Sequence, residues 1–176
     1  AFAQRVRNGD QQSLDRLNTW LMHWLDKNPP YLGANWKCGQ EASIRLIHLC
    51  CAVLILGQER SSSHGLQQLV RLHLLRISPT IHYAIAQNNN HGTSEAAALF
   101  IGGSLLRHCG SSDGEKWEKL GRHWLENRVY KLIENDGSFS QYSLNYHRML
   151  IDTLSITEVW RQRLQISKFS SQFYDK

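Results

Sequence analysis

Apolar residues recur at helical spacing along nearly the whole chain. The first segment follows the i, i+3, i+4, i+7 rule of an amphipathic helix at Leu14, Leu17, Trp20, Leu21, Trp24 and Leu25. Ser13 stands where a helix cap is expected, and Asn28-Pro29-Pro30 stops the pattern. This stretch therefore predicts a helix that begins near Ser13 and ends at Asn28.

Six further helices are predicted, joined by short loops that carry turn-forming residues. Their ranges are 40–56, 66–76, 79–86, 95–107, 114–133 and 144–160. We expect Thr93 or Ser94 to cap the fourth of these helices, Asp113 the fifth and Ser143 the last. The stretch from 167 to 176 is weakly patterned.

No run of alternating residues predicts a strand, so the fold class is all-α. Helix, short loop and helix recur as an array of helical hairpins. Periodicity leaves three arrangements open, namely a bundle, a solenoid or a toroid. The 176 residues predict one domain over 1–176. The first ten residues show no signal-peptide pattern and no initiator Met, so we expect a processed chain or a fragment.

Charge and composition narrow the classes of partner. With 41% hydrophobic and 20% charged residues, the chain is expected to fold. The net charge of +5 favours nucleic acid, an anionic membrane or an acidic polysaccharide. The basic residues are scattered and no reading helix is recognisable, which argues against nucleic acid. No apolar run reaches the roughly 20 residues of a membrane span.

The cysteines and histidines give no metal-binding pattern. Four cysteines occur without a C-x-x-C pair, and no two histidines share a helix face at i, i+4. We expect free, buried thiols and no metal or other cofactor.

Three polar clusters are candidates for chemistry. In the first, Trp36 precedes Glu41 and Arg45, which have the i, i+4 spacing of a helical ion pair. The alternative function is a sugar platform, Trp36, beside an arginine that binds a carboxylate.

The second cluster is the run QNNNHGTSEAAA at 87–98. Asn90 and His91 at a helix N-terminus can stabilise an anion, although an asparagine-rich stretch is also typical of a plain turn. Glu95, four residues after His91, either orients the imidazole or only begins the helix favourably.

In the third cluster, Tyr142, Tyr146 and His147 stand close together at 142–147. A tyrosine next to a histidine can transfer a proton, or it can be a packed anchor at the start of a helix.

The segments NNNHGTSEAAALF and, further on, DGSFSQYSLNYH together resemble the heparinase II/III-like polysaccharide lyases, a group with related alginate lyases. The segment NWKCGQEASIRLIH looks like the helical start of that family, and the resemblance covers about 35–160. It implies an incomplete (α/α) toroid, with the β-sandwich domain of the family outside this chain. The chain would then be a fragment of a longer lyase.

The resemblance also implies roles for individual residues. Asn90 matches the asparagine that neutralises the substrate carboxylate, and His91 matches the histidine that assists there or acts as base. Tyr146 matches the tyrosine that protonates the leaving glycosidic oxygen and in some members also removes the proton. We add Trp36, Arg45, Glu95 and His147 as candidate substrate-binding residues. The family uses a further histidine from a later part of the protein, for which His147 is no substitute.

The leading hypothesis is a lyase that cleaves a uronic-acid-containing polysaccharide by β-elimination, without metal. A glycosaminoglycan, alginate or a bacterial capsule polymer would each fit. The alternative is a non-catalytic toroid that binds an acidic glycan or serves as a scaffold. A periplasmic or secreted location is suggested by the resemblance alone.

Overall fold

The structure is a computed structural model that describes residues 1–176. Its helices are α1 (Phe2–Arg7), α2 (Gln12–Lys27), α3 (Gly39–Leu56), α4 (His64–Ile77), α5 (Ile81–Ala86), α6 (Asn90–His108), α7 (Ser112–Leu132), α8 (Leu144–Arg163) and α9 (Ser171–Tyr174). Two 3₁₀ turns lie at Ala34–Trp36 and Ser78–Thr80. The only extended pairing is an isolated antiparallel bridge between Ile133 and Phe139, so the all-α prediction is confirmed.

Helix α6 runs through the centre of the molecule. All of its 19 residues except His91, Arg107 and His108 are buried. Its apolar side chains join those of α3, α4, α7 and α8 in one core of 23 buried residues. Because α6 is apolar on all sides, other helices must cover each of its sides, and these four helices do so.

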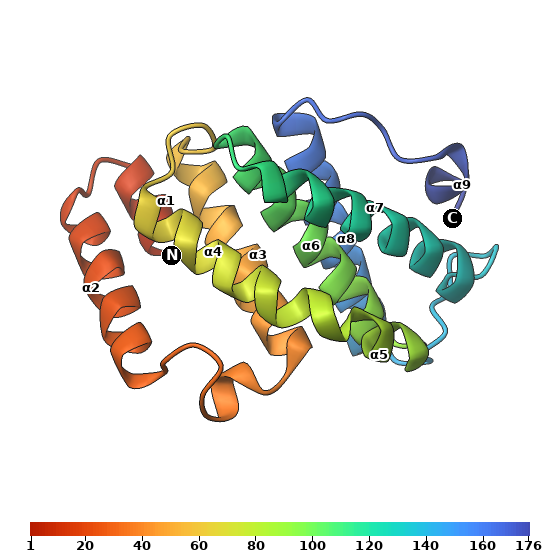
Figure 1. Ribbon diagram of the computed structural model, residues 1–176. Coiled ribbons are helices and arrows are strands. Elements are labelled where there is room, and N and C mark those ends of the chain that lie inside the picture. The colour runs from red at the N-terminus through yellow and green to blue at the C-terminus, as the bar shows by residue number, and fades with distance from the viewer.

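The long helices α3, α4, α6, α7 and α8 alternate in direction along the chain (Figure 1). Asn90, at the start of α6, contacts Met149 near the start of α8, while Ser104 binds Trp160 near its end, so α6 and α8 are parallel. Helix α3 is also parallel to α6, because Gly39 lies against Glu95 and Leu46 against Gly102.

Helices α4 and α7 form a second layer over α3, α6 and α8 in Figure 1, and they run in the opposite direction. Parallel helices in one layer and antiparallel helices in the other are the arrangement of helical hairpins in an (α/α) toroid. The prediction of an incomplete toroid is confirmed by the arrangement of α3 to α8.

Glycines bring α6 and α7 into direct backbone contact. A Cβ atom added to Gly121 of α7 would lie 2.2 Å from the backbone N of Phe100, and one added to Gly103 of α6 would lie 2.4 Å from the backbone N of Glu118. Gly114 is equally close to Arg107. The two helices can pack at this distance only because three positions lack a side chain.

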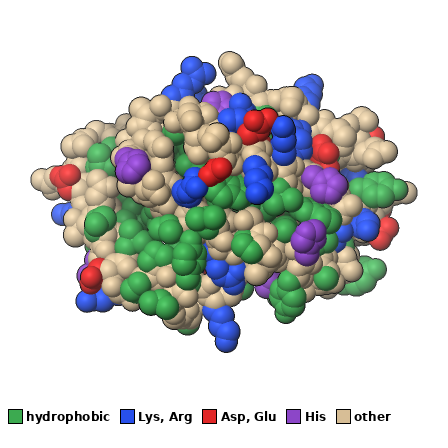
Figure 2. Space-filling model, in the orientation of Figure 1, with side chains coloured by type: hydrophobic (Ala, Val, Ile, Leu, Met, Phe, Trp, Pro, Cys, Tyr) green, Lys and Arg blue, Asp and Glu red, His purple; other side chains and the backbone are tan.

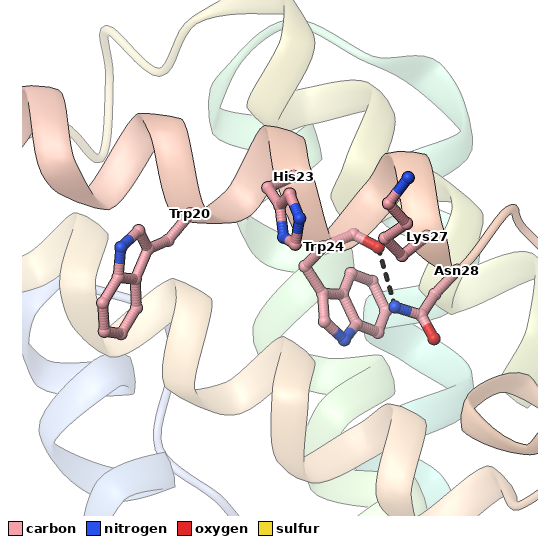
Figure 3. A pocket seen from close by; sticks show the side chains of 5 residues that line it. All are labelled: Trp20, His23, Trp24, Lys27 and Asn28. Carbon is pink, nitrogen blue, oxygen red and sulfur yellow. Dashed lines mark hydrogen bonds between the residues drawn. The ribbon is translucent and has the colours of Figure 1, made fainter.

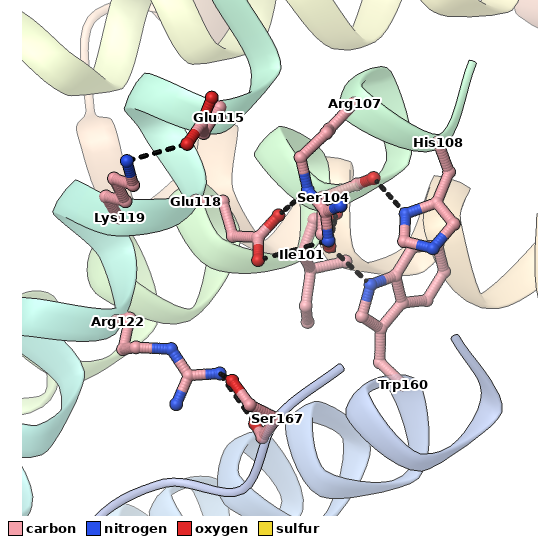
Figure 4. Close-up of polar contacts among 10 residues, drawn as sticks. All are labelled: Ile101, Ser104, Arg107, His108, Glu115, Glu118, Lys119, Arg122, Trp160 and Ser167. Atoms are coloured by element: carbon pink, nitrogen blue, oxygen red, sulfur yellow. Dashed lines mark hydrogen bonds and ion pairs between the residues drawn. The ribbon is translucent and has the colours of Figure 1, made fainter. Parts of the chain in front are cut away.

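Polar contacts fix the far end of this assembly (Figure 4). The indole Nε1 of Trp160 donates to Ser104 Oγ at 2.7 Å, and both side chains are fully buried. Arg107 of α6 pairs with Glu118 of α7 through an Nε–Oε2 contact of 2.6 Å. These bonds fix the register of α7 and α8 against α6.

Several predicted helix starts are wrong by a few residues. Helix α6 begins at Asn90 with Asn89 as its cap, so Thr93 and Ser94 lie inside the helix and are buried. Ser111 rather than Asp113 precedes α7. Ser13 is within α2, where its hydroxyl donates to Asp10. The short helices α1 and α9 are missed, since they have too few residues to show a period.

Helix α3 is the one helix whose length and composition would suffice to cross a membrane, and the core helix of a folded domain passes the same test. Seven of its residues are buried in this domain.

The contact at Gly121 predicts that alanine there destabilises the protein, whereas alanine at an open helical glycine stabilises it. In an open helical position, Gly→Ala stabilises by about 0.5–1 kcal/mol, and Gly65 of α4, with no atom within 4 Å of an added Cβ, is such a position. We expect Gly65→Ala to stabilise slightly and Gly121→Ala to destabilise by about 1–3 kcal/mol, because the methyl group meets backbone. Urea unfolding of both variants measures the difference. Equal stability of Gly121→Ala and the parent protein would contradict the contact.

Candidate functional site

The N-termini of α3, α6 and α8 meet at one end of the molecule (Figure 1). The side-chain amides of Gln40 in α3 and Asn90 in α6 both point at the sulfur of Met149 in α8, with N–S distances of 3.4 and 3.5 Å. The backbone N–H of Asn90 donates to Gln141 Oε1 at 2.8 Å. Each helix N-terminus carries a partial positive charge, so their convergence favours an anion.

The three consecutive asparagines have three different tasks. Asn88 has a left-handed backbone (φ 49°), which asparagine tolerates better than most residues, and its Oδ1 accepts a hydrogen bond from Arg128 Nη1 at 2.9 Å. Asn89 caps α6, because its Oδ1 accepts the backbone N–H of His91 at 2.9 Å. Asn90 is then the first residue of the helix and directs its amide toward α8.

Arg128 holds the turn between α5 and α6 in place through hydrogen bonds. It lies in α7, is only 2% exposed, and also donates to the carbonyl oxygen of Ile85 at 3.0 Å. Its aliphatic part passes against Gly92, where an added Cβ would lie 3.0 Å from Arg128 Cδ. The arginine therefore holds both the end of α5 and the start of α6.

His91 is the residue of the α6 N-terminus that keeps contact with solvent. It is half-buried, whereas every residue from Gly92 to Leu106 is buried. Burial lowers the pKa of the imidazole below its ordinary value of 6.5. The ring is therefore mostly neutral at pH 7, which is the form that can accept a proton.

Tyr146 lies in the first turn of α8, and Met149 of the same helix contacts the start of α6. Tyr146 is 41% exposed. Residues three apart share a helix face, so Tyr146 lies on the side of α8 that carries Met149 and hence Asn90. His147 is half-buried and lies one position further around the helix.

Glu95 is buried beneath this end of the molecule. It is 3% exposed, and its Oε2 has no hydrogen-bond partner. The carboxyl group lies against Gly39, where an added Cβ would be 2.5 Å from Oε1. Burial raises the pKa of Glu95 to about 7, although the charge of Arg76 acts in the opposite direction. No hydrogen bond joins Glu95 to His91, so the predicted orienting contact is not present.

The first predicted cluster is a packing unit. Trp36 is 1% exposed, its ring packs against those of Trp24, Tyr31 and His73, and its Nε1 donates to Asn28 O at 3.0 Å. A sugar platform needs an open ring face, so that role for Trp36 is wrong in this conformation.

Arg45 makes no ion pair with Glu41. Its guanidinium lies over the rings of Trp24 and Trp36, 5.1 and 5.5 Å from their centroids, and donates to Asn35 O. Burial lowers the pKa of Arg45. The residue joins α3 to α2 and to the loop between them, and its contacts do not extend to α8.

Sequence reasoning missed four supporting residues, Gln40, Arg128, Gln141 and Met149. Gln141 lies within the DGSFSQYSLNYH segment, and Met149 follows Tyr146 at the i, i+3 spacing, so both had a usable signal. Arg128 had none. No group of three or more His, Cys, Asp or Glu side chains is arranged to hold a metal ion. All four cysteines are free, and only Cys50 is fully buried.

Comparison with known proteins identifies the family. A family model described as Heparinase II/III N-terminus matches residues 9–176. The match covers nearly the whole chain, so the chain belongs to this family. No curated protein and no solved structure matches it.

The buried Glu95 predicts a stability that falls as pH rises. Its pKa is about 7 in the folded protein and near the ordinary 4.5 in the unfolded chain, so between these values the folded state holds a proton that the unfolded state has lost. The ionised carboxylate then destabilises the protein above pH 7, by roughly 3 kcal/mol at about 1.4 kcal/mol per pKa unit. We expect Glu95→Gln to be more stable than the parent at pH 8, with the gain shrinking toward pH 4.5.

The measurement is the free energy of unfolding of both proteins across that range. Glu41→Gln is the matched control, because Glu41 is exposed on the neighbouring helix. A gain for Glu95→Gln that does not depend on pH would show that the carboxyl has an ordinary pKa.

Proposed function

We propose that this member of the heparinase II/III N-terminus family is the helical part of a polysaccharide lyase, which cleaves a uronic-acid-containing polysaccharide by β-elimination. The observation that carries the proposal is the meeting of the α6 and α8 N-termini, where Asn90 reaches Met149 and Gln141. It brings the Asn90–His91 pair and Tyr146 to one end of the domain. We propose further that a β-sandwich domain later in the same protein completes the site.

The reaction needs stabilisation of negative charge beside a weakly acidic proton. The C5 proton of a uronate lies next to a carboxylate, and its removal places additional charge on that group. Hydrogen-bond donors already fixed in position stabilise such charge without reorganisation. Asn90 and the positive N-termini of α3 and α6 supply donors of this kind, with no metal required.

The remaining two residues take the proton-transfer roles. Neutral His91 removes the C5 proton, or it assists at the carboxylate while Tyr146 removes that proton and then returns it to O4. The C5 electron pair forms the C4–C5 double bond as the C4–O4 bond breaks. Tyr146, which is 41% exposed, donates its phenolic proton to the departing O4. His147, the next residue of α8, is proposed to contact the sugar.

Met149 controls access to Asn90. Asn90 is 3% exposed, and its Nδ2 lies 3.5 Å from the sulfur of Met149. The unbranched thioether has three rotatable bonds and adapts its shape at low cost. We propose that rotation of Met149 opens the amide to a substrate carboxylate. Glu95 lies too deep for a direct contact, so we assign it a supporting place below the site.

A second function follows from the same covered amide. If Met149 stays over Asn90, the site binds an acidic glycan at its rim without turnover. That module would show saturable binding weakened by salt, and no unsaturated product.

Two substitutions test the lyase assignment in the full-length protein. The unsaturated uronate absorbs in the ultraviolet, so its release is followed directly against a series of uronate polymers. We expect Tyr146→Phe to lower kcat by about 10²–10⁴-fold, the range for a general acid or base. Asn90→Ala should lower it by about 10²–10³-fold, the range for one lost donor.

Tyr142→Phe is the matched control, since Tyr142 is 92% exposed four residues earlier and should leave the rate unchanged. Turnover by the parent together with unchanged rates in Tyr146→Phe and Asn90→Ala would refute these roles. Saturable binding with no product from the parent would support the glycan-binding module in place of the lyase.

A further inference from the structure

Helix α2 stands apart from the rest of the domain and carries an aromatic face. Trp20, His23, Trp24, Lys27 and Asn28 have the i, i+3, i+4, i+7, i+8 spacing of a single helix face, and together they line a groove of about 510 Å³. Figure 3 shows both indole rings projecting from the same side of α2. Figure 2 shows apolar side chains gathered over the region between α2 and α4.

Trp20 presents open ring surface, whereas the ring of Trp24 is partly covered by Trp36 and Arg45. Trp20 is 67% exposed, and its one aromatic contact, with Phe2, is edge-to-face at a centroid distance of 5.2 Å. Trp24 is half-buried and has the Arg45 guanidinium 5.1 Å from its ring centroid. The rings are four residues apart, or about 6 Å along the helix axis, so both can meet one short chain of sugar rings.

The groove also has the charge that an acidic sugar requires. None of its five lining residues is acidic, Lys27 is exposed at the rim, and Arg45 adds positive charge beside Trp24. Lys27 pairs with Asp26 at 3.0 Å, but both side chains are largely exposed, so this ion pair is weak and can exchange for a ligand carboxylate. The amide of Asn28 donates to Trp24 O at 2.8 Å and its Oδ1 accepts from Asn35 Nδ2, so bonds within the protein hold this side chain at the end of the groove.

The five groove residues differ from those proposed for catalysis. Trp20 to Asn28 all belong to α2 and its C-cap, whereas Asn90, His91 and Tyr146 belong to α6 and α8. The α2 groove is connected to the body of the domain by the Trp24–Trp36 contact and by Arg45. The groove therefore shares no residue with the site proposed for catalysis.

We propose that the α2 groove is a second binding site for a uronate-containing oligosaccharide. Trp20 and Trp24 stack against the faces of the sugar rings, and Lys27 binds a uronate carboxylate. The site would hold a long polymer at a distance from the point of cleavage. The choice of an acidic glycan as the ligand rests on the proposed function.

Calorimetric titration of the full-length protein carrying Tyr146→Phe tests this site, with uronate oligosaccharides as the probe. We expect Trp20→Ala to weaken binding about tenfold, as for a buried aromatic contact in an interface. Lys27→Gln should weaken it about threefold and reduce its dependence on salt. A neutral oligosaccharide of the same length should bind more weakly than the acidic one.

Met22→Ala is the matched control, because Met22 is also 67% exposed on α2 but lies outside the groove. Binding that is the same in Trp20→Ala and Met22→Ala would overturn the site, even if the unsaturated product forms as proposed. Loss of binding in Trp20→Ala alone would support the site, even if no polymer is cleaved. Equal affinity for neutral and acidic oligosaccharides would overturn the role of Lys27.

Discussion

Direct backbone contact between α6 and α7 is the constraint on which the rest of the structure depends. Gly103, Gly114 and Gly121 leave no side chain between the two helices, so their separation is fixed by backbone atoms. Backbone cannot change rotamer to relieve a clash, which makes this distance less adjustable than an ordinary side-chain contact. The position of α6 decides where its N-terminus lies, and with it the position of Asn90 and His91.

Two further sets of contacts complete the placement of the candidate site. Arg128 reaches from α7 to the turn before α6 and holds Asn88 and the Ile85 carbonyl group. Trp160 and Met149 join α8 to α6 at opposite ends, through Ser104 and Asn90. Tyr146 is therefore positioned by the packing of a whole helix, while His91 is positioned by a cap and a buried arginine. A site built in this way depends on core residues that make no contact with substrate.

The sequence was sufficient for the helical fold because its apolar spacing is regular in the long helices. The sequence was insufficient to locate the helix ends, because a single capping hydrogen bond decides at which residue a helix begins. Thr93 and Ser94 have the usual chemistry of a cap, but the left-handed turn at Asn88 allows Asn89 to cap first.

Trp36 shows a different limit. Its position beside charged residues is compatible with a surface or a core, and only the folded chain shows that Trp24, Tyr31 and His73 enclose it. The grouping of Asn90 with Tyr146 came from a family resemblance, since no local pattern joins residues 56 positions apart.

The α6–α7 contact has a consequence for the order of folding. The two helices are joined by only three residues, 109–111, so their contact closes a short loop and loses little chain entropy. Contacts between α8 and α6 join residues more than 50 positions apart and form at a higher entropic cost. We expect the α6–α7 hairpin to form first, with Asn90 already placed, and α8 to bring Tyr146 to it last. Pulsed hydrogen exchange during refolding would then protect the amides of α6 and α7 before those of α8.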